Sequence, residues 1–194
     1  MSGRTGRGAG APLHFLALIG SLRRGSYNRM LYRAALELLP EGVTMSDADV
    51  SLPLYDDDVR AQSGYPPAAA RLRERIAAAD AVVFFTPEYN YSIPGVLKNA
   101  IDWASRPPDQ PFRDKPVSVM GASTGAIGTA RMQYHLRQCM VFVEALPLAK
   151  PEVMVTFVGH KFDESGGLVD EATRDVVAGQ LAALAAWTRR LAGG

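Results

Sequence analysis

The sequence predicts an α/β fold in which helices cover both faces of a parallel sheet. Five short and almost continuously apolar runs alternate with five helical patterns along the chain. Continuous apolar runs are typical of strands that are buried on both faces, as they are in parallel sheets. No internal repeat and no linker divides the chain, so we expect these elements to share one core.

The first half of the chain supplies two strands and one helix before a long loop. The clearest strand candidate is HFLALIG at 14–20, which closes on a glycine. A helix follows and is expected to stop before Pro40, because apolar residues recur there at helical spacing, at Leu31, Ala34, Ala35 and Leu38. Residues 43–49 form a weaker, more polar strand, expected at an edge of the sheet. The segment 50–66 contains prolines and a glycine and is expected to be a loop.

The remaining elements continue the alternation. We expect helices at 67–79, 94–104, 129–143 and 171–191, and strands at 81–86, 116–122 and 153–158. Two strand orders suit five parallel strands: the flavodoxin-like order 2-1-3-4-5, which gives a three-layer α/β/α sandwich, or half of a Rossmann domain. In both folds, ligands bind beyond the carboxyl ends of the strands, so the loops after the first, third and fourth strands are candidate site loops.

Composition and length restrict the classes of function. The chain has 194 residues, and its 21 basic and 20 acidic residues give a formal net charge of +1, which would not gather nucleic acid or an anionic membrane. The single cysteine, Cys139, excludes an intrachain disulfide. No apolar run approaches the ~20 residues that a membrane helix needs, so we expect a cytoplasmic protein. We expect residues 1–12 to be a disordered tail and 13–194 to form a single domain.

The loop after the first strand, GSLRRGSYN at 20–28, offers donors suited to a terminal phosphate beside a helix N-terminus. Its donor side chains are those of Ser21, Arg23, Arg24, Ser26 and Asn28. The loop matches neither the GxGxxG nor the GxxxxGK[ST] pattern, so a single phosphate fits better than a pyrophosphate. The alternative is an ordinary helix start that Ser26 or Asn28 caps, with exposed arginines.

Two further loops would lie at the same end of the sheet. The segment TPEYNYSIPG at 86–95 could form a wall for a flat heteroaromatic ring, or it could be a proline-braced turn with half-buried tyrosines. The segment GASTGAIG at 121–128 is rich in small residues, which either let a ligand approach the backbone or serve positive φ angles. Each loop is ambiguous alone, but their meeting at one end of one sheet favours a ligand site.

The same segments carry a resemblance to a known family. GSLRRGSYN, TPEYNYSIPGVLKNAIDWASR and GASTGAIGTARMQYHLR resemble the three signatures of the NADPH-dependent FMN reductase family, especially its bacterial chromate reductase and quinone reductase branch. The resemblance covers about residues 13–158. It implies a flavodoxin-like fold, non-covalently bound FMN, and two-electron transfer from NADPH or NADH to a small-molecule acceptor by a ping-pong mechanism. Quinones are the expected acceptors, and chromate, azo compounds and free flavin are further candidates.

The resemblance also implies roles for individual residues. Those that would hold the FMN phosphate are Ser21, Arg23, Ser26, Tyr27 and Asn28. Those that would flank the isoalloxazine ring are Pro87, Glu88, Tyr89, Asn90 and Tyr91, and the ring site would be completed by Ser123, Thr124 and Gly125. Backbone N–H groups of 88–91 and 123–125 would stabilise charge on the reduced ring. No catalytic side chain is expected, because the flavin N5 carries the hydride chemistry.

A homo-oligomer is a further expectation, because dimers and tetramers are usual in this family. The residues 94–104 and 131–152 would build it, with the large side chain of Trp103 among polar neighbours. A polar network between subunits is expected at Tyr91, Arg131, Tyr134 and Glu152, and a solvated helix face is the alternative. Arg106 and Arg113 are candidate ligands for the 2′-phosphate of NADPH.

Three other features are expected to be structural rather than functional. Cys139 shares an apolar stripe with its helix neighbours, which favours packing over redox chemistry. His14, His135 and His160 are widely separated and show no metal-ligand spacing. The acidic run Asp56–Asp58 is expected to be a solvated loop.

Two rival functions remain open at this point. An electron carrier without its own NAD(P)H oxidation would need the same flavin site, but such carriers tend to be strongly acidic and this chain is neutral. A phosphate-ligand sensor would leave the tyrosine-rich loop without a purpose.

Overall fold

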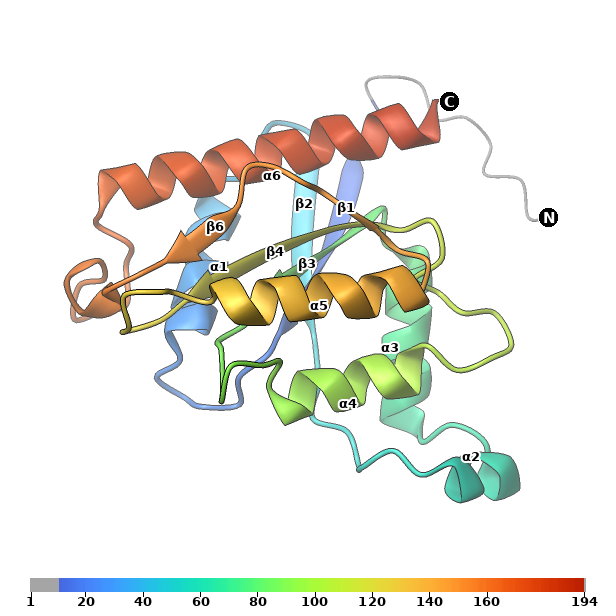
Figure 1. The fold of residues 1–194 in the computed structure, drawn as a ribbon. Coiled ribbons are helices and arrows are strands. Elements are labelled where there is room, and N and C mark those ends of the chain that lie inside the picture. The colour runs from blue at the N-terminus through green and yellow to red at the C-terminus, as the bar shows by residue number, and fades with distance from the viewer. Residues whose placement is uncertain (1–10, 194) are drawn as a thin grey trace.

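A parallel sheet lies between two layers of helices in the computed structural model, which describes residues 11–193 (Figure 1). Its strands are β1 (Leu13–Ile19), β2 (Val43–Ala48), β3 (Ala81–Phe85), β4 (Pro116–Ala122), β5 (Leu146–Pro147) and β6 (Val153–Val155). Its helices are α1 (Tyr27–Glu37), α2 (Asp57–Ser63), α3 (Pro67–Ala78), α4 (Gly95–Ala104), α5 (Ala130–Phe142), α6 (Glu171–Ala192) and a 3₁₀ turn at Val158–His160. Of the expected tail, residues 1–10 lie outside the described part of the chain.

The strand order is β2-β1-β3-β4-β5 and every pairing is parallel, which confirms the flavodoxin-like order and not half of a Rossmann domain. Strand β1 pairs with β2 on one side and with β3 on the other. The strand order therefore reverses beside β1, and the loops that follow β1 and β3 leave the sheet at this switch point.

Alternate residues of the strands point into two separate cores. Phe15, Val83 and Phe85 pack with residues of α1 and α6 on one face, whereas Leu16 and Phe84 pack with residues of α3, α4 and α5 on the other. This division follows from the period of two in a strand, which sends neighbouring side chains to opposite faces. Figure 1 shows the same division, with α6 and α1 on one side of the sheet and α3, α4 and α5 on the other.

The fifth position of the sheet corrects one expectation. Two short strands, β5 and β6, both pair with β4, where a single strand at 153–158 was expected. Strand β5 ends at Pro147, and Pro151 lies between β5 and β6. The two strands are separate because proline cannot donate to a strand ladder. Strand β6 ends at Val155, since Phe157 has a φ of 49° and turns the chain into the 3₁₀ turn.

The acidic run Asp56–Asp58 is a second correction, because it begins a helix inside the expected loop 50–66. Asp56 is the N-cap of α2, and its side chain accepts hydrogen bonds from the backbone N–H groups of Asp58 and Val59. Carboxylates in the first turn of a helix are stabilised by its N-terminal partial charge. None of the helices within residues 11–193 is long and apolar enough to cross a membrane.

The long helix α6 begins at another aspartate cap. Asp170 accepts hydrogen bonds from the Thr173 N–H (3.0 Å) and from the Lys161 ammonium (2.8 Å). Hydrogen bonds from Lys161 and Thr173 lower the pKa of the Asp170 carboxyl from 3.8 to about 2. The carboxylate is therefore favoured by folding. Its stabilising contribution is present above about pH 4 and is lost as the pH falls toward 2.

We predict that Asp170→Asn lowers the free energy of unfolding at pH 7 and that its difference from the unsubstituted protein shrinks between pH 4 and pH 2. Urea denaturation across this pH range measures both quantities. Asp175→Asn, which changes an exposed carboxylate on the same helix, is the matched control. A difference that stays constant down to pH 2 would contradict the assigned role.

Candidate functional site

The loop after β1 packs directly against the loop after β3. Ser21 and Ser26 are buried, and Ser26 occupies the N-cap position of α1 without a side-chain cap hydrogen bond. Gly20 leaves no room for a side chain, because an added Cβ would lie 2.2 Å from the Thr86 Oγ1. The two loops therefore start from adjacent points at the carboxyl edge of the sheet.

The chemistry of the loop after β1 suits an anion. Arg23 and Arg24 are exposed, and the described first turn of α1 contains no acidic residue. The Arg23 guanidinium lies over the ring of Tyr27, 5.8 Å from its centroid. Exposed guanidinium groups beside the N-terminus of a helix attract a phosphate, and the unbonded Ser26 hydroxyl can donate to it. These residues therefore fit the phosphate of FMN.

Asn28 has a different place from the other predicted phosphate ligands. Its side chain is buried, and both of its polar atoms bond to the backbone of Ala122 at the end of β4. The Nδ2 donates to the Ala122 carbonyl at 3.0 Å, and the Oδ1 accepts from the Ala122 N–H at 2.9 Å. Asn28 therefore ties the start of α1 to the strand that leads into the third loop.

The loop after β3 contains a tight two-residue turn. Tyr89 and Ser92 exchange both backbone hydrogen bonds, at 3.1 and 2.9 Å. The two residues between them, Asn90 and Tyr91, have φ angles of 49° and 67°. A hairpin turn of this kind needs positive φ at both central positions, which asparagine tolerates and tyrosine does not favour. The turn leaves Tyr89 half exposed and Tyr91 exposed, so only Tyr89 is half-buried in the way that an ordinary braced turn would have it.

The loop after β4 is anchored at its first residue. The N–H of Ser123 donates to the Val155 carbonyl at 2.9 Å, and the Ser123 carbonyl accepts from the Val158 N–H at 3.2 Å. Its hydroxyl accepts a hydrogen bond from the N–H of Gly125 at 3.1 Å. Thr124 and Gly125 are exposed beyond this anchor. Ser123 therefore fixes the loop, and the two residues after it face the open edge of the site.

The expected row of backbone N–H donors is only partly available. The N–H groups of Tyr89, Ser123 and Gly125 are already bonded within the protein. Within residues 11–193, no hydrogen bond engages the N–H groups of Glu88, Asn90, Tyr91 and Thr124. The free donors that could face the edge of a bound ring are therefore fewer than the sequence suggests.

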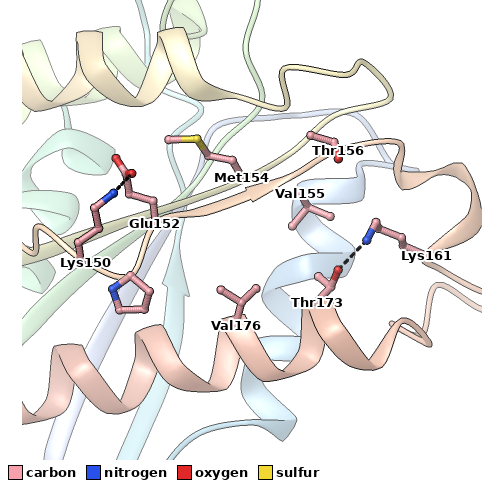
Figure 2. Close-up of a pocket in the computed structure, with 9 residues that line it drawn as sticks. Lys150, Glu152, Met154, Val155, Thr156, Lys161, Thr173 and Val176 are labelled. Carbon is pink, nitrogen blue, oxygen red and sulfur yellow. Dashed lines mark hydrogen bonds and ion pairs between the residues drawn. The ribbon is translucent and has the colours of Figure 1, made fainter.

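Two predicted residues lie apart from these loops. Glu152 lines a groove of about 790 Å³ between β6 and α6, beside Lys150 and Met154 (Figure 2). A hydrogen bond from Lys150 is the main cause that lowers the pKa of Glu152, and Tyr134 lies near enough to lower it slightly further. Tyr134 and Glu152 thus form one cluster, whereas Tyr91 and Arg131 form another.

The candidate 2′-phosphate ligands lie at the opposite edge of the sheet. Arg106 follows the C-terminus of α4, and Arg113 precedes the start of β4. Helices that connect parallel strands run back to the amino edge, so both arginines lie away from the site loops of the same chain. Arg106 contacts the Asp102 carbonyl and the Tyr55 ring instead, and Arg113 pairs with Glu144.

The histidines and the cysteine have local partners. His14 contacts Thr44 and Ser46, and within residues 11–193 no group of three or more His, Cys, Asp or Glu side chains could hold a metal ion. Cys139 is partly buried against the core beneath α5, and burial raises the pKa of its thiol. The thiol form is therefore favoured, as expected for a packing residue.

Sequence reasoning missed how α5 contacts the loop after β3. Glu88 bonds to Arg131 and to the N–H of Met132, and the Ser92 hydroxyl lies 2.8 Å from the Nδ1 of His135. Arg131 and His135 are four residues apart, so they share one face of α5. This spacing could have indicated a polar face on α5, but it does not predict which loop packs against that face.

We predict that Asn28→Ala lowers the free energy of unfolding by about 2–4 kcal/mol, because the N–H and carbonyl of Ala122 are left buried without partners. Urea denaturation measures this loss. Arg24→Ala, in an exposed side chain of the same loop, should change stability by much less. Equal stability of Asn28→Ala and the unsubstituted protein would show that the pair with Ala122 does not hold the loops together.

Comparison with known proteins agrees with this arrangement. Residues 13–160 match the family model of NADPH-dependent FMN reductase. An NAD(P)H-dependent FMN reductase of Pseudomonas aeruginosa is 55% identical over 92% of this chain and 96% of its own length. A quinone reductase of Escherichia coli is 45% identical over 92% of this chain and 97% of its own length.

Solved structures give the same result. The flavoenzyme NAD(P)H:(acceptor) oxidoreductase FerB of Paracoccus denitrificans superposes with a TM-score of 0.84 at 34% identity, over 92% of this chain and 98% of that one. The family match covers far more than half of the chain and includes all three site loops. The chain belongs to the NADPH-dependent FMN reductase family.

Proposed function

We propose that this protein is an FMN-dependent NAD(P)H oxidoreductase that transfers two electrons to quinones. The observation that carries the proposal is the meeting of three loops at one edge of the sheet: a cationic loop at a helix N-terminus, a tyrosine-bearing turn, and a loop of small residues. Relatives named as FMN reductase and quinone reductase support it over nearly the whole chain. A cytoplasmic location, where NAD(P)H is available, fits this reaction.

The residues divide between phosphate and ring. Ser21, Ser26 and Arg23 would hold the phosphate, with Tyr27 beside them, and Asn28 would position their loop through Ala122. The ring would be flanked by Pro87, Glu88, Tyr89, Asn90, Tyr91, Ser123, Thr124 and Gly125. FMN, when bound, supplies an N5 atom that accepts and returns hydride. The protein contributes orientation and N–H donors at the ring edge, and no side chain needs to act as acid or base.

The exposed rim of the site suits successive binding of two flat substrates. Tyr89, Tyr91 and Ile127 are at least half exposed at this edge. Exposed aromatic faces can stack on a nicotinamide or on a quinone. Since one open surface serves donor and acceptor in turn, we propose a ping-pong reaction. Chromate, azo compounds and free flavin would use the same open surface.

We predict that the purified protein retains FMN after incubation and desalting and that NADPH or NADH bleaches its visible absorption under anaerobic conditions. Addition of a benzoquinone should then restore the flavin absorption with a two-electron stoichiometry. Retained flavin that neither nucleotide bleaches would indicate an electron carrier. A protein that retains no flavin would refute the assignment of all three loops.

We also propose a homodimer or homotetramer joined through the face formed by α4 and α5. Val141 and Phe142 are each about three-quarters exposed at the end of α5. Phe142 lines a hollow of about 370 Å³ together with α4 residues such as Lys98 and Ile101. An exposed apolar pair beside a hollow is a feature of protein interfaces. Tyr134 and Glu152 lie in one cluster. We propose that they are the polar residues of this interface.

We predict that size-exclusion chromatography with light scattering gives the mass of a dimer or tetramer at micromolar concentration. Phe142→Ser should shift the protein toward the monomer, whereas Val169→Ser, in an exposed side chain just before α6 on the other side of the sheet, should not. A monomeric unsubstituted protein at these concentrations would contradict the proposal.

A further inference from the structure

One face of α5 holds the turn that follows β3. The Arg131 guanidinium bonds to the Glu88 carboxylate at 3.2 Å and lies 3.7 Å from the centroid of the Tyr91 ring. One helical turn further on, the His135 ring lies 2.8 Å from the Ser92 hydroxyl. The segment 88–92 is therefore contacted from α5 at its beginning, at its tip and at its end.

Glu88 is the least exposed part of this contact. Its side chain is only 10% exposed, and its second carboxylate oxygen accepts a hydrogen bond from the Met132 N–H at 3.1 Å. Met132 lies in the first turn of α5, where N–H groups lack partners within the helix and the helix dipole favours a negative charge. The carboxylate is thus satisfied by α5 on both oxygens, so its charge is turned away from the open edge of the site.

The turn has a reason to need this support. Tyr91 has a φ of 67°, and a residue with a side chain in this region is strained. Such a conformation persists only when the surrounding structure imposes it. The Arg131 guanidinium covers the exposed Tyr91 ring and gives it a stacked partner, which is the contact that can compensate the strain.

We infer that Arg131 is a positioning residue of its own subunit: it holds the turn 88–92 in the shape that receives the isoalloxazine ring. This inference rests on the proposed function, because it supposes that the turn faces FMN. It differs from the expected role of Arg131 in a network between subunits. Its charge is engaged by Glu88 and its planar face by Tyr91, both in the same chain.

The contact also explains how two site loops are kept at a fixed separation. Glu88 lies at the start of the loop after β3, and α5 begins directly after the loop that follows β4. A bond between Glu88 and the start of α5 therefore joins the two loops on the side opposite to the Asn28–Ala122 pair. Loosening the bond would alter the gap into which a flat ring must fit.

The test compares FMN affinity among four single variants, one double variant and the unsubstituted protein. Arg131→Met removes the charge and the stacking, whereas Arg131→Lys keeps the charge but loses the planar guanidinium. Tyr91→Leu removes the ring on which Arg131 stacks. Arg60→Met is the matched control, because Arg60 is similarly exposed (25% against 33%) and also pairs with a carboxylate, on α2. Flavin fluorescence titration measures the dissociation constant, and thermal unfolding without FMN measures stability.

We expect Arg131→Met to weaken FMN binding by about tenfold or more, with a smaller loss for Arg131→Lys and an affinity for Arg60→Met equal to that of the unsubstituted protein. The loss of affinity in the double variant Arg131→Met/Tyr91→Leu should be smaller than the sum of the two single losses, expressed as free energies, because Arg131 and Tyr91 act as one unit. The visible spectrum of bound FMN should change in the Arg131 variants, which a loss of stability alone would not produce. Light scattering should find the same oligomer as before.

Other results would overturn the inference. Unchanged FMN affinity and spectrum in Arg131→Met would refute it while leaving the proposed function intact. A loss of oligomer mass that accompanies the whole effect on FMN would assign Arg131 to the subunit interface instead. Failure of the unsubstituted protein to bind FMN would refute the proposed function and this inference together.

Discussion

The register of the parallel sheet is the constraint on which the site depends. Ile19 at the end of β1 lies opposite Phe85 at the end of β3, and Phe85 lies opposite Met120 near the end of β4. Three chain segments that are far apart in sequence therefore leave the sheet at almost the same level. Two close contacts reinforce this alignment: no Cβ fits at Gly20 against Thr86 or at Gly121 against Thr129. Larger residues at either glycine would push the loops apart and with them the two halves of the site.

The sequence was sufficient for the strand order of the sheet and for the edge at which the three candidate loops meet, because both follow from local patterns. Buried runs such as 81–85 have no polar residue, and helix spacing is clear in α1 and α4. What the sequence did not reveal depends on distant partners or on very short elements. The pairing of Asn28 with Ala122 spans 94 residues, and nothing in GSLRRGSYN indicates that this amide is already bonded. Strand β5 has two residues and leaves no periodic pattern to read.

The family resemblance predicts roles for single residues, which their spacing alone does not. In the structure, these residues are of two kinds. Arg23 has an exposed group that a ligand can reach, whereas Asn28 and Ser123 are engaged in holding loops together. A motif residue in a ligand site can therefore act on the ligand or on the geometry around it. Sequence alone does not distinguish these two uses, because both place the same residue type at the same position.

The contrast between a fixed base and an exposed rim has a consequence for substrate selection. The base of the site is held by buried contacts: Asn28 with Ala122, Glu88 with the start of α5, and Gly20 against Thr86. The rim, by comparison, consists of side chains such as Tyr89 and Ile127 that are about half exposed. Selectivity in a site comes from buried polar groups that a wrong ligand leaves unpaired. The buried polar groups named here are bonded within the protein, so they fix the shape of the site and do not select among ligands. An aromatic, open rim without such groups would then accept many flat electron acceptors.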